Sequence, residues 1–198
     1  MLTAETFLDR YTKACEEGYA ALFVGAGLSR PSGFVDWKEM LRDIAKELRL
    51  DVDRETDLVA LAQYHVNTSR SRARLNQALI EEFTKNAKLT ENHQLIAGLP
   101  IRTVWTTNYD QLLEQVYREA HKSPDVKITQ ENLAITIPGR DVTIYKMHGD
   151  VSQPDNAVLT KEDYELYNNH RLVFSEKLKG DLIERTFLFL GFSFTDTN

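Results

Sequence analysis

The feature that most constrains the fold is an apolar run followed at once by closely spaced glycines, in the segment AALFVGAGLSRPSG from Ala20 to Gly33. The run at 20–24 has the length and bulk of a buried parallel strand. Gly25 and Gly27 then allow a sharp turn where a Cβ would obstruct the backbone. In an open α/β sheet such a turn most often faces a nucleotide phosphate, held by backbone N–H groups.

Helical and apolar segments alternate along the rest of the chain. Further strands are expected at 104–110, 142–150 and 186–194, with shorter ones at 126–129 and 133–136, and helical patterns lie between them, including 37–48 and 57–86. The alternation predicts the α/β class with a doubly wound, Rossmann-like parallel sheet. We expect one domain over residues 1–198 with a helical insertion at roughly 37–100. Since few residues follow the last strand, where a helix ordinarily covers the sheet, we expect the chain to be truncated at its C-terminal end.

Composition excludes several classes of function. The chain has 198 residues and a net charge of −6, so its overall balance gives no reason to expect direct binding to nucleic acid or to an anionic membrane. It contains one cysteine, Cys15, which cannot form a disulfide framework or a four-cysteine zinc site. No apolar stretch is long enough for a membrane span, and the N-terminus lacks the pattern of a signal peptide. These features predict a cytoplasmic protein without a bound metal.

Four predicted strands end in residues that a purely structural role does not require. These ends are GAGLS at 25–29, TNYD at 107–110, HGD at 148–150 and GFS at 191–193. Parallel strands place their carboxyl ends along one edge of the sheet, where open α/β folds bind ligands. Each motif alone is weak, because a glycine pair can serve helix packing, an Asn can be a turn residue and a lone His can be a buried structural residue. Together they predict one site at this edge.

In order and spacing, the motifs GAGLS, TNYD, KMHGD and LGFSF resemble those of the sirtuin superfamily, and most of all its bacterial sirtuin-like branch, which supplies NAD-hydrolysing domains of anti-phage defence systems. The resemblance extends from about residue 20 to residue 198. It implies a catalytic His148 and an Asn108 at the ribose. It further implies that NAD is held by Gly25, Ala26, Gly27, Ser29, Asp110, Gly191 and Ser193.

The chain departs from protein-deacylating sirtuins in three places. It lacks the cysteines of their zinc ribbon, and the segment after the glycine turn reads GFVDWKEM, without the arginine that sirtuins carry there. Asp36 lies near the equivalent position and is counted as a candidate for cofactor binding. Thr107, also a candidate, replaces the usual Gln before the Asn, which removes one expected ribose contact. These departures favour water over an acylated lysine as the acceptor.

The candidate residues suit the cleavage of NAD between nicotinamide and ribose. The amide of Asn108 can both donate and accept hydrogen bonds, so it can hold a ribose hydroxyl or the attacking water. An imidazole such as that of His148 can accept a proton near neutral pH. Asp110 can contact the nicotinamide carboxamide or support the ribosyl cation, or it can cap the helix that follows; the sequence leaves these alternatives open. Ser29 and Ser193 can likewise contact the ligand or cap a turn.

The function that these features predict is an NAD glycohydrolase that yields nicotinamide and ADP-ribose and depletes NAD as a defence effector. An alternative is a module that binds or senses NAD or ADP-ribose without turnover, although a binder needs no base such as His148. A protein-lysine deacylase ranks last because no zinc ribbon can be formed. The resemblance also implies a homo-oligomer and a partner such as an ATPase, an Argonaute-like protein or a phage protein.

Overall fold

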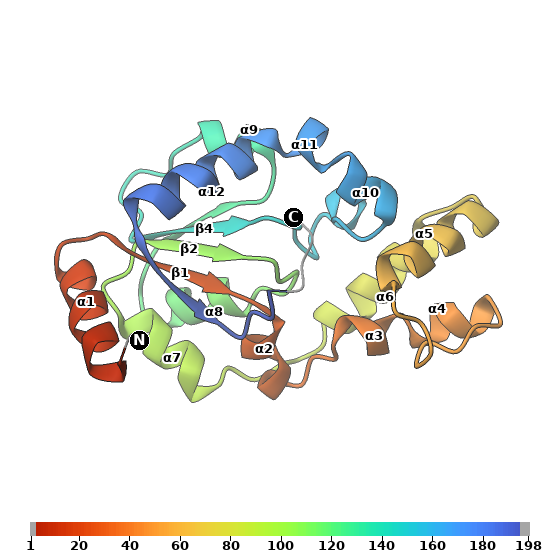
Figure 1. Cartoon of the computed structure of the whole chain (residues 1–198), viewed down its shortest axis with the longest axis horizontal. Helices are drawn as coiled ribbons and strands as arrows, with labels where there is room; N and C mark the ends of the chain where they lie inside the picture. The colour runs from red at the N-terminus through yellow and green to blue at the C-terminus, as the bar shows by residue number, and fades with distance from the viewer. Residues whose placement is uncertain (1–2, 195–198) are drawn as a thin grey trace.

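A sheet of five parallel strands forms the centre of the computed structural model, which describes residues 3–194 (Figure 1). Its strand order is β3-β4-β2-β1-β5, and every neighbouring pair is parallel. In the centre, Leu22 pairs with Val104 on one side and Leu188 on the other. The predicted α/β class and Rossmann-like parallel sheet are therefore confirmed. The strands are β1 (Ala20–Val24), β2 (Thr103–Thr106), β3 (Pro124–Lys127), β4 (Val142–Lys146) and β5 (Thr186–Leu190).

Helices connect the strands and cover both faces of the sheet (Figure 1). The short 3-10 turn η1 (Arg30–Ser32) lies between α2 and α3, and η2 (Pro154–Asn156) lies between β4 and α10. The helices are α1 (Ala4–Glu16), α2 (Ala26–Ser29), α3 (Trp37–Met40), α4 (Arg42–Glu47), α5 (Leu58–Ser69), α6 (Ala73–Phe83), α7 (Glu91–Gly98), α8 (Leu112–Glu119), α9 (Gln130–Ala134), α10 (Lys161–Glu165), α11 (Tyr167–His170) and α12 (Leu172–Glu184).

The alternation of side chains along β1 explains why helices are needed on both faces. Leu22 and Val24 point to one face, where they join a core formed with α1, α7 and α8. Phe23 points to the other face, where it packs in a separate cluster with Trp105 and with Phe174 of α12. All five residues of β1 are buried, as expected for an inner strand of a parallel sheet. None of the helices described in residues 3–194 is long and apolar enough to cross a membrane.

Helices α3 to α6 extend beyond the carboxyl ends of the strands (Figure 1). They pack in a further hydrophobic cluster, which also includes Ala157 and Leu159. Leu41, Ile44 and Leu75 are fully buried in it. Helix α7 instead packs in the core beneath the sheet. The helices beyond the strand ends form one wall of the site described below. The bounds of the single domain and of its insertion stay predictions.

Some predicted elements differ from the observed ones. The strand predicted at 133–136 is wrong, because Thr129 forms a capping box with Asn132 and starts helix α9 there. The helix predicted at 37–48 begins as expected at Asp36, whose side chain accepts a hydrogen bond from the Glu39 N–H, but it breaks at residue 41 into α3 and α4. The helical stretch at 57–86 is broken at Arg70, which has a positive φ of 51°.

Candidate active site

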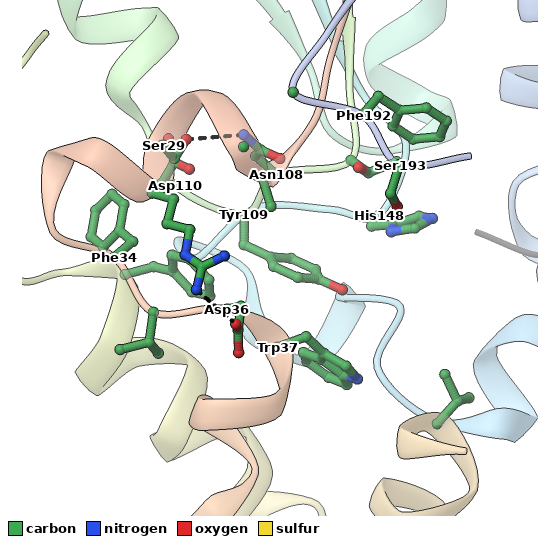
Figure 2. Close-up of a pocket in the computed structure, with 18 of the residues that line it drawn as sticks. Ser29, Phe34, Asp36, Trp37, Asn108, Tyr109, Asp110, His148, Phe192 and Ser193 are labelled. Atoms are coloured by element: carbon green, nitrogen blue, oxygen red, sulfur yellow. Dashed lines mark hydrogen bonds and ion pairs between the residues drawn. The ribbon is translucent and has the colours of Figure 1, made fainter. Parts of the chain in front are cut away.

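The four predicted strand ends meet around one cavity of about 480 Å³ at the carboxyl edge of the sheet (Figure 2). Gly25 is the one predicted residue that does not line it. Asn108 and His148 lie on its wall together with the other predicted residues, which are Ala26, Gly27, Ser29, Asp36, Thr107, Asp110, Gly191 and Ser193. The carboxyl edge of the sheet thus brings residues from positions 26 to 193 around one space.

The glycine turn after β1 packs directly against the backbone that follows β5. A Cβ on Gly25 would lie 2.6 Å from the carbonyl oxygen of Gly191, and a Cβ on Gly27 would lie 2.7 Å from the Cα of Gly191. The N–H groups of Gly25 and Gly27 donate to the carbonyls of Leu190 and Gly191, both at 2.9 Å. The two glycines therefore permit the close approach of two strand ends, and both of their N–H groups already have backbone partners.

Asn108 is held in a fixed orientation by the glycine turn. Its side-chain Nδ2 donates to the carbonyl of Gly25 at 3.1 Å and to the Oγ of Ser29 at 3.0 Å. Because a carbonyl oxygen can only accept, the nitrogen of the amide must face Gly25 and the oxygen must face away from it. The Oδ1 atom is buried and has no hydrogen-bond partner within residues 3–194. An amide oxygen left in this way on a cavity wall suits a hydroxyl or water donor.

His148 follows β4 and is 3% exposed. The ring of Tyr164 meets the imidazole edge-on, with the ring centroids 5.6 Å apart. The backbone carbonyl of His148 accepts a hydrogen bond from the Val158 N–H at 2.9 Å. Gly149 then turns the chain with a φ of 90°, a conformation that favours glycine. Backbone and ring contacts together hold the imidazole at the cavity.

A buried ammonium contacts both segments that carry the candidate catalytic residues. Lys146, the last residue of β4, is 1% exposed and donates to the carbonyl of Asp110 and to the carboxylate of Asp150. It also bonds Glu114 of α8 at 3.1 Å. Burial alone would lower the pKa of Lys146, but Glu114 and Asp150 outweigh it and hold that pKa above its ordinary value, whereas burial raises the pKa of Glu114. The ammonium of Lys146 thus contacts both the segment that carries Asn108 and the segment that carries His148.

Of the roles that the sequence left open for Asp110, the structure shows the one at the start of the helix that follows. Its Oδ1 accepts from the N–H of Leu112 at 3.0 Å, at the start of α8, so it serves the helix terminus. Its Oδ2 is buried without a hydrogen-bond partner in the described part of the chain. His93 of α7 is near enough to interact electrostatically: burial lowers the pKa of His93 and Asp110 opposes that shift. One oxygen of Asp110 is therefore structural, and the other is left for a further donor.

The segment between α2 and α3 forms the outer wall of the cavity. Arg30, Phe34 and Trp37 from this region line the cavity together with Asp36. The carboxylate of Asp36 accepts from the Glu39 N–H at 3.0 Å and pairs with Arg30 at 3.5 Å. Trp37 also packs against the cluster of the helices beyond the strand ends, so it belongs to both the core and the wall.

Sequence reasoning missed several lining residues. A pattern signal existed for Tyr109, which lies between two predicted residues, and for Arg30, Phe34 and Val35, which continue the glycine turn. Phe192 likewise lies between two predicted residues. No local signal marked Val59, Phe83 and Tyr164, because they come from helices distant in sequence. Within residues 3–194 no group of three or more His, Cys, Asp or Glu side chains could hold a metal ion.

The sheet order and the site at the strand ends define a Rossmann-like α/β protein. The sequence is similar to one family within this class: residues 102–198 match the family model of the SIR2-like domain. This match confirms the resemblance to sirtuins over that part of the chain.

Curated relatives extend this match over nearly the whole chain. The protein named NAD(+) hydrolase ThsA from Cytobacillus dafuensis is 50% identical over 192 residues, which are 97% of this chain and 39% of that protein. The protein of the same name from Acinetobacter baumannii is 51% identical over 191 residues, 96% of this chain and 40% of that protein. Defense-associated sirtuin 2 of Bacillus subtilis is 25% identical over 199 residues, 96% of this chain and 19% of that protein. The chain spans about two-fifths of the length of the two NAD hydrolases.

Proposed function

We propose that this chain is the NAD-hydrolysing part of a defence effector, which cleaves NAD into nicotinamide and ADP-ribose. The observation that carries the proposal is that Asn108 and His148 lie on the wall of the same cavity, with Asn108 8% and His148 3% exposed. The names of the relatives, NAD(+) hydrolase and defense-associated sirtuin, support the same activity and context. The buried Oδ1 of Asn108 supports the fit, because a ribose hydroxyl or a water would satisfy it.

The residues suggest how the reaction would proceed. The bond between ribose C1′ and the nicotinamide nitrogen breaks, its electron pair leaves with nicotinamide, and positive charge develops on the ribose. The oxygen of Asn108 orients a hydroxyl or the water, and the carboxylate of Asp110 stabilises the positive charge. Water adds to C1′, and its proton passes to the imidazole of His148. The chain thereby supplies position, electrostatic support and a base.

The wider setting forms part of the same proposal. We place the reaction in the cytoplasm, where NAD is consumed, and we expect the protein to act as a homo-oligomer with a protein partner such as an ATPase, an Argonaute-like protein or a phage component. The support is the SIR2-like domain and its similarity to a defense-associated sirtuin.

Product analysis tests the proposed reaction. The purified chain is incubated with NAD, and nicotinamide, ADP-ribose and cyclic ADP-ribose are separated by chromatography, in parallel with a sample that also contains an acetylated peptide. Nicotinamide and ADP-ribose in equal amounts are expected. NAD that raises the melting temperature without forming products would instead identify a sensor. O-acetyl-ADP-ribose in the sample with peptide would identify a deacylase.

A further inference from the structure

A buried carboxylate of α6 contacts the outer wall of the cavity from outside it. Glu82 is 5% exposed, although glutamate is seldom buried without a partner. Its Oε1 accepts a hydrogen bond from the backbone N–H of Val35 at 2.7 Å, and its Oε2 pairs with the ammonium of Lys85. Both carboxylate oxygens of Glu82 therefore have a partner. Through its bond to Val35, Glu82 connects α6 to the segment after the glycine turn.

The segment that Glu82 holds is the one at 30–36, which we call the wall loop. It joins α2 to α3 and contributes Arg30, Phe34, Val35 and Asp36 to the lining of the cavity. The wall loop includes Gly33, whose φ is 106°, so the chain turns sharply just before the residues that face the cavity.

A second contact holds the next position of the wall loop. The ring of Phe34 packs against Phe83, with the ring centroids 5.3 Å apart, and Phe34 is buried. Two consecutive residues of α6, Glu82 and Phe83, thus hold two consecutive residues of the wall loop, Phe34 and Val35. The ring contact fixes where the side chain lies, and the hydrogen bond fixes the backbone.

We propose that Glu82 is a positioning residue that holds the wall loop in the conformation that binds NAD, and that it sets the affinity for NAD rather than the rate of the chemical step. The inference rests on the proposed function for its ligand. The inference gives α6 a role in the site. Glu82 and its partner Val35 are 47 positions apart in the sequence and become neighbours only in the folded chain. Glu82 does not line the cavity itself, so its effect must pass through Val35.

The kinetic test compares three variants. Glu82→Ala is expected to raise the KM for NAD about tenfold, which corresponds to about 1.4 kcal/mol, with kcat within about twofold of wild type. Glu82→Gln keeps an acceptor oxygen but a weaker, uncharged one, so its KM is expected to rise about threefold. The matched control is Glu81→Ala: the side chain of Glu81 is 59% exposed, and this variant is expected to keep the wild-type KM.

Hydrogen exchange tests the same role without any turnover. Peptides that cover 30–36 are expected to exchange amide hydrogens faster in Glu82→Gln than in wild type, and faster still in Glu82→Ala, while Glu81→Ala matches wild type. If the wild-type chain failed to hydrolyse NAD but this order held, the proposed function would fail and the positioning role would stand. Unchanged exchange at 30–36 in both Glu82 variants would overturn the proposal, and so would a fall in kcat at unchanged KM. If Glu82→Ala does not fold, Glu82→Gln alone decides between these outcomes.

Discussion

At the scale of single residues, the site depends on side chains that have both a structural partner and an atom left for a ligand. Asn108 gives both amide hydrogens to the glycine turn and keeps its oxygen at the cavity. Asp110 likewise uses one oxygen at the start of α8, and its other oxygen is buried without a partner in the described part of the chain. Such residues are held in place before any ligand arrives, which lowers the cost of ordering them when it binds.

Asn108→Asp tests whether the site needs the amide hydrogens of Asn108. The substitution keeps the shape of the side chain but sets a carboxylate against the carbonyl of Gly25, so we expect loss of NAD hydrolysis and a free energy of unfolding lower by roughly 1–3 kcal/mol. Urea denaturation and nicotinamide release measure the two effects. The same change at the exposed Asn168 serves as the control. Full activity in Asn108→Asp would show that the amide hydrogens are dispensable.

Sequence could predict the residues of the site whose signal is local. Asn108 and His148 stand two residues after the ends of β2 and β4, where a buried polar residue needs an explanation. Lys146 gives no such signal, because a lysine at a strand end ordinarily reaches solvent, and its burial depends on Glu114 and on Asp150. Glu82 is hidden for another reason, since its partner Val35 becomes its neighbour only through the tertiary fold.

At the scale of elements, the backbone after β1 contacts the backbone after β5 at glycines, with no side chain between them. Gly191 has a φ of 62°, and a Cβ there would lie 2.5 Å from the backbone nitrogen of Leu28. The glycine turn and the loop after β5 can therefore be adjacent only if no Cβ stands between them. Since both segments line the cavity, the shape of the cavity depends on this contact.

Gly191→Ala is expected to destabilise the fold by several kcal/mol, because the new Cβ meets backbone atoms and the positive φ disfavours alanine. The control is Gly180→Ala in α12, where a Cβ would find no atom within 4 Å; this change is expected to be neutral or to stabilise by up to about 1 kcal/mol. Thermal unfolding of both variants measures the difference. Equal melting temperatures would contradict the role of this contact.

The predicted elements failed where a local capping choice or a tertiary contact outweighed periodicity. The apolar residues at 133–136 suggested a strand, yet the capping box at Thr129 starts a helix just before them. The pattern at 57–86 is helical throughout, but Arg70 adopts a left-handed conformation and Arg72 turns toward Asp163. The buried strand β1 was predictable because its apolar run is continuous.

At the scale of the whole molecule, the helices beyond the strand ends are fastened to the sheet portion by a polar contact. Arg72, at the start of α6, donates to Asp163 of α10 at 2.7 Å and also to the carbonyl of Ala157. Asp163 further accepts from the N–H groups of Leu159 and Thr160. Burial alone would raise the pKa of Asp163, but these N–H groups and Arg72 outweigh it and hold that pKa below its ordinary value.

This contact makes stability depend on pH in a definite direction. A carboxylate with a lowered pKa in the folded state stabilises the fold above its unfolded pKa, about 4, and loses that contribution as the pH falls further. We therefore expect the free energy of unfolding of Asp163→Asn to fall less steeply than that of wild type between about pH 5 and pH 3. Denaturation by urea at several pH values measures the slopes, with the exposed Asp9→Asn as the control. Parallel slopes for wild type and Asp163→Asn would refute the assignment.

We propose that the cavity at the strand ends hydrolyses NAD with His148 as the base. The measurement that tests it most directly is the rate of nicotinamide release by wild type, by His148→Ala and by the control His170→Ala, whose side chain is exposed. We expect a loss of at least about 100-fold in His148→Ala, with NAD still raising the melting temperature of the variant, and a wild-type rate in His170→Ala. A wild-type rate in folded His148→Ala would show that His148 is not the base.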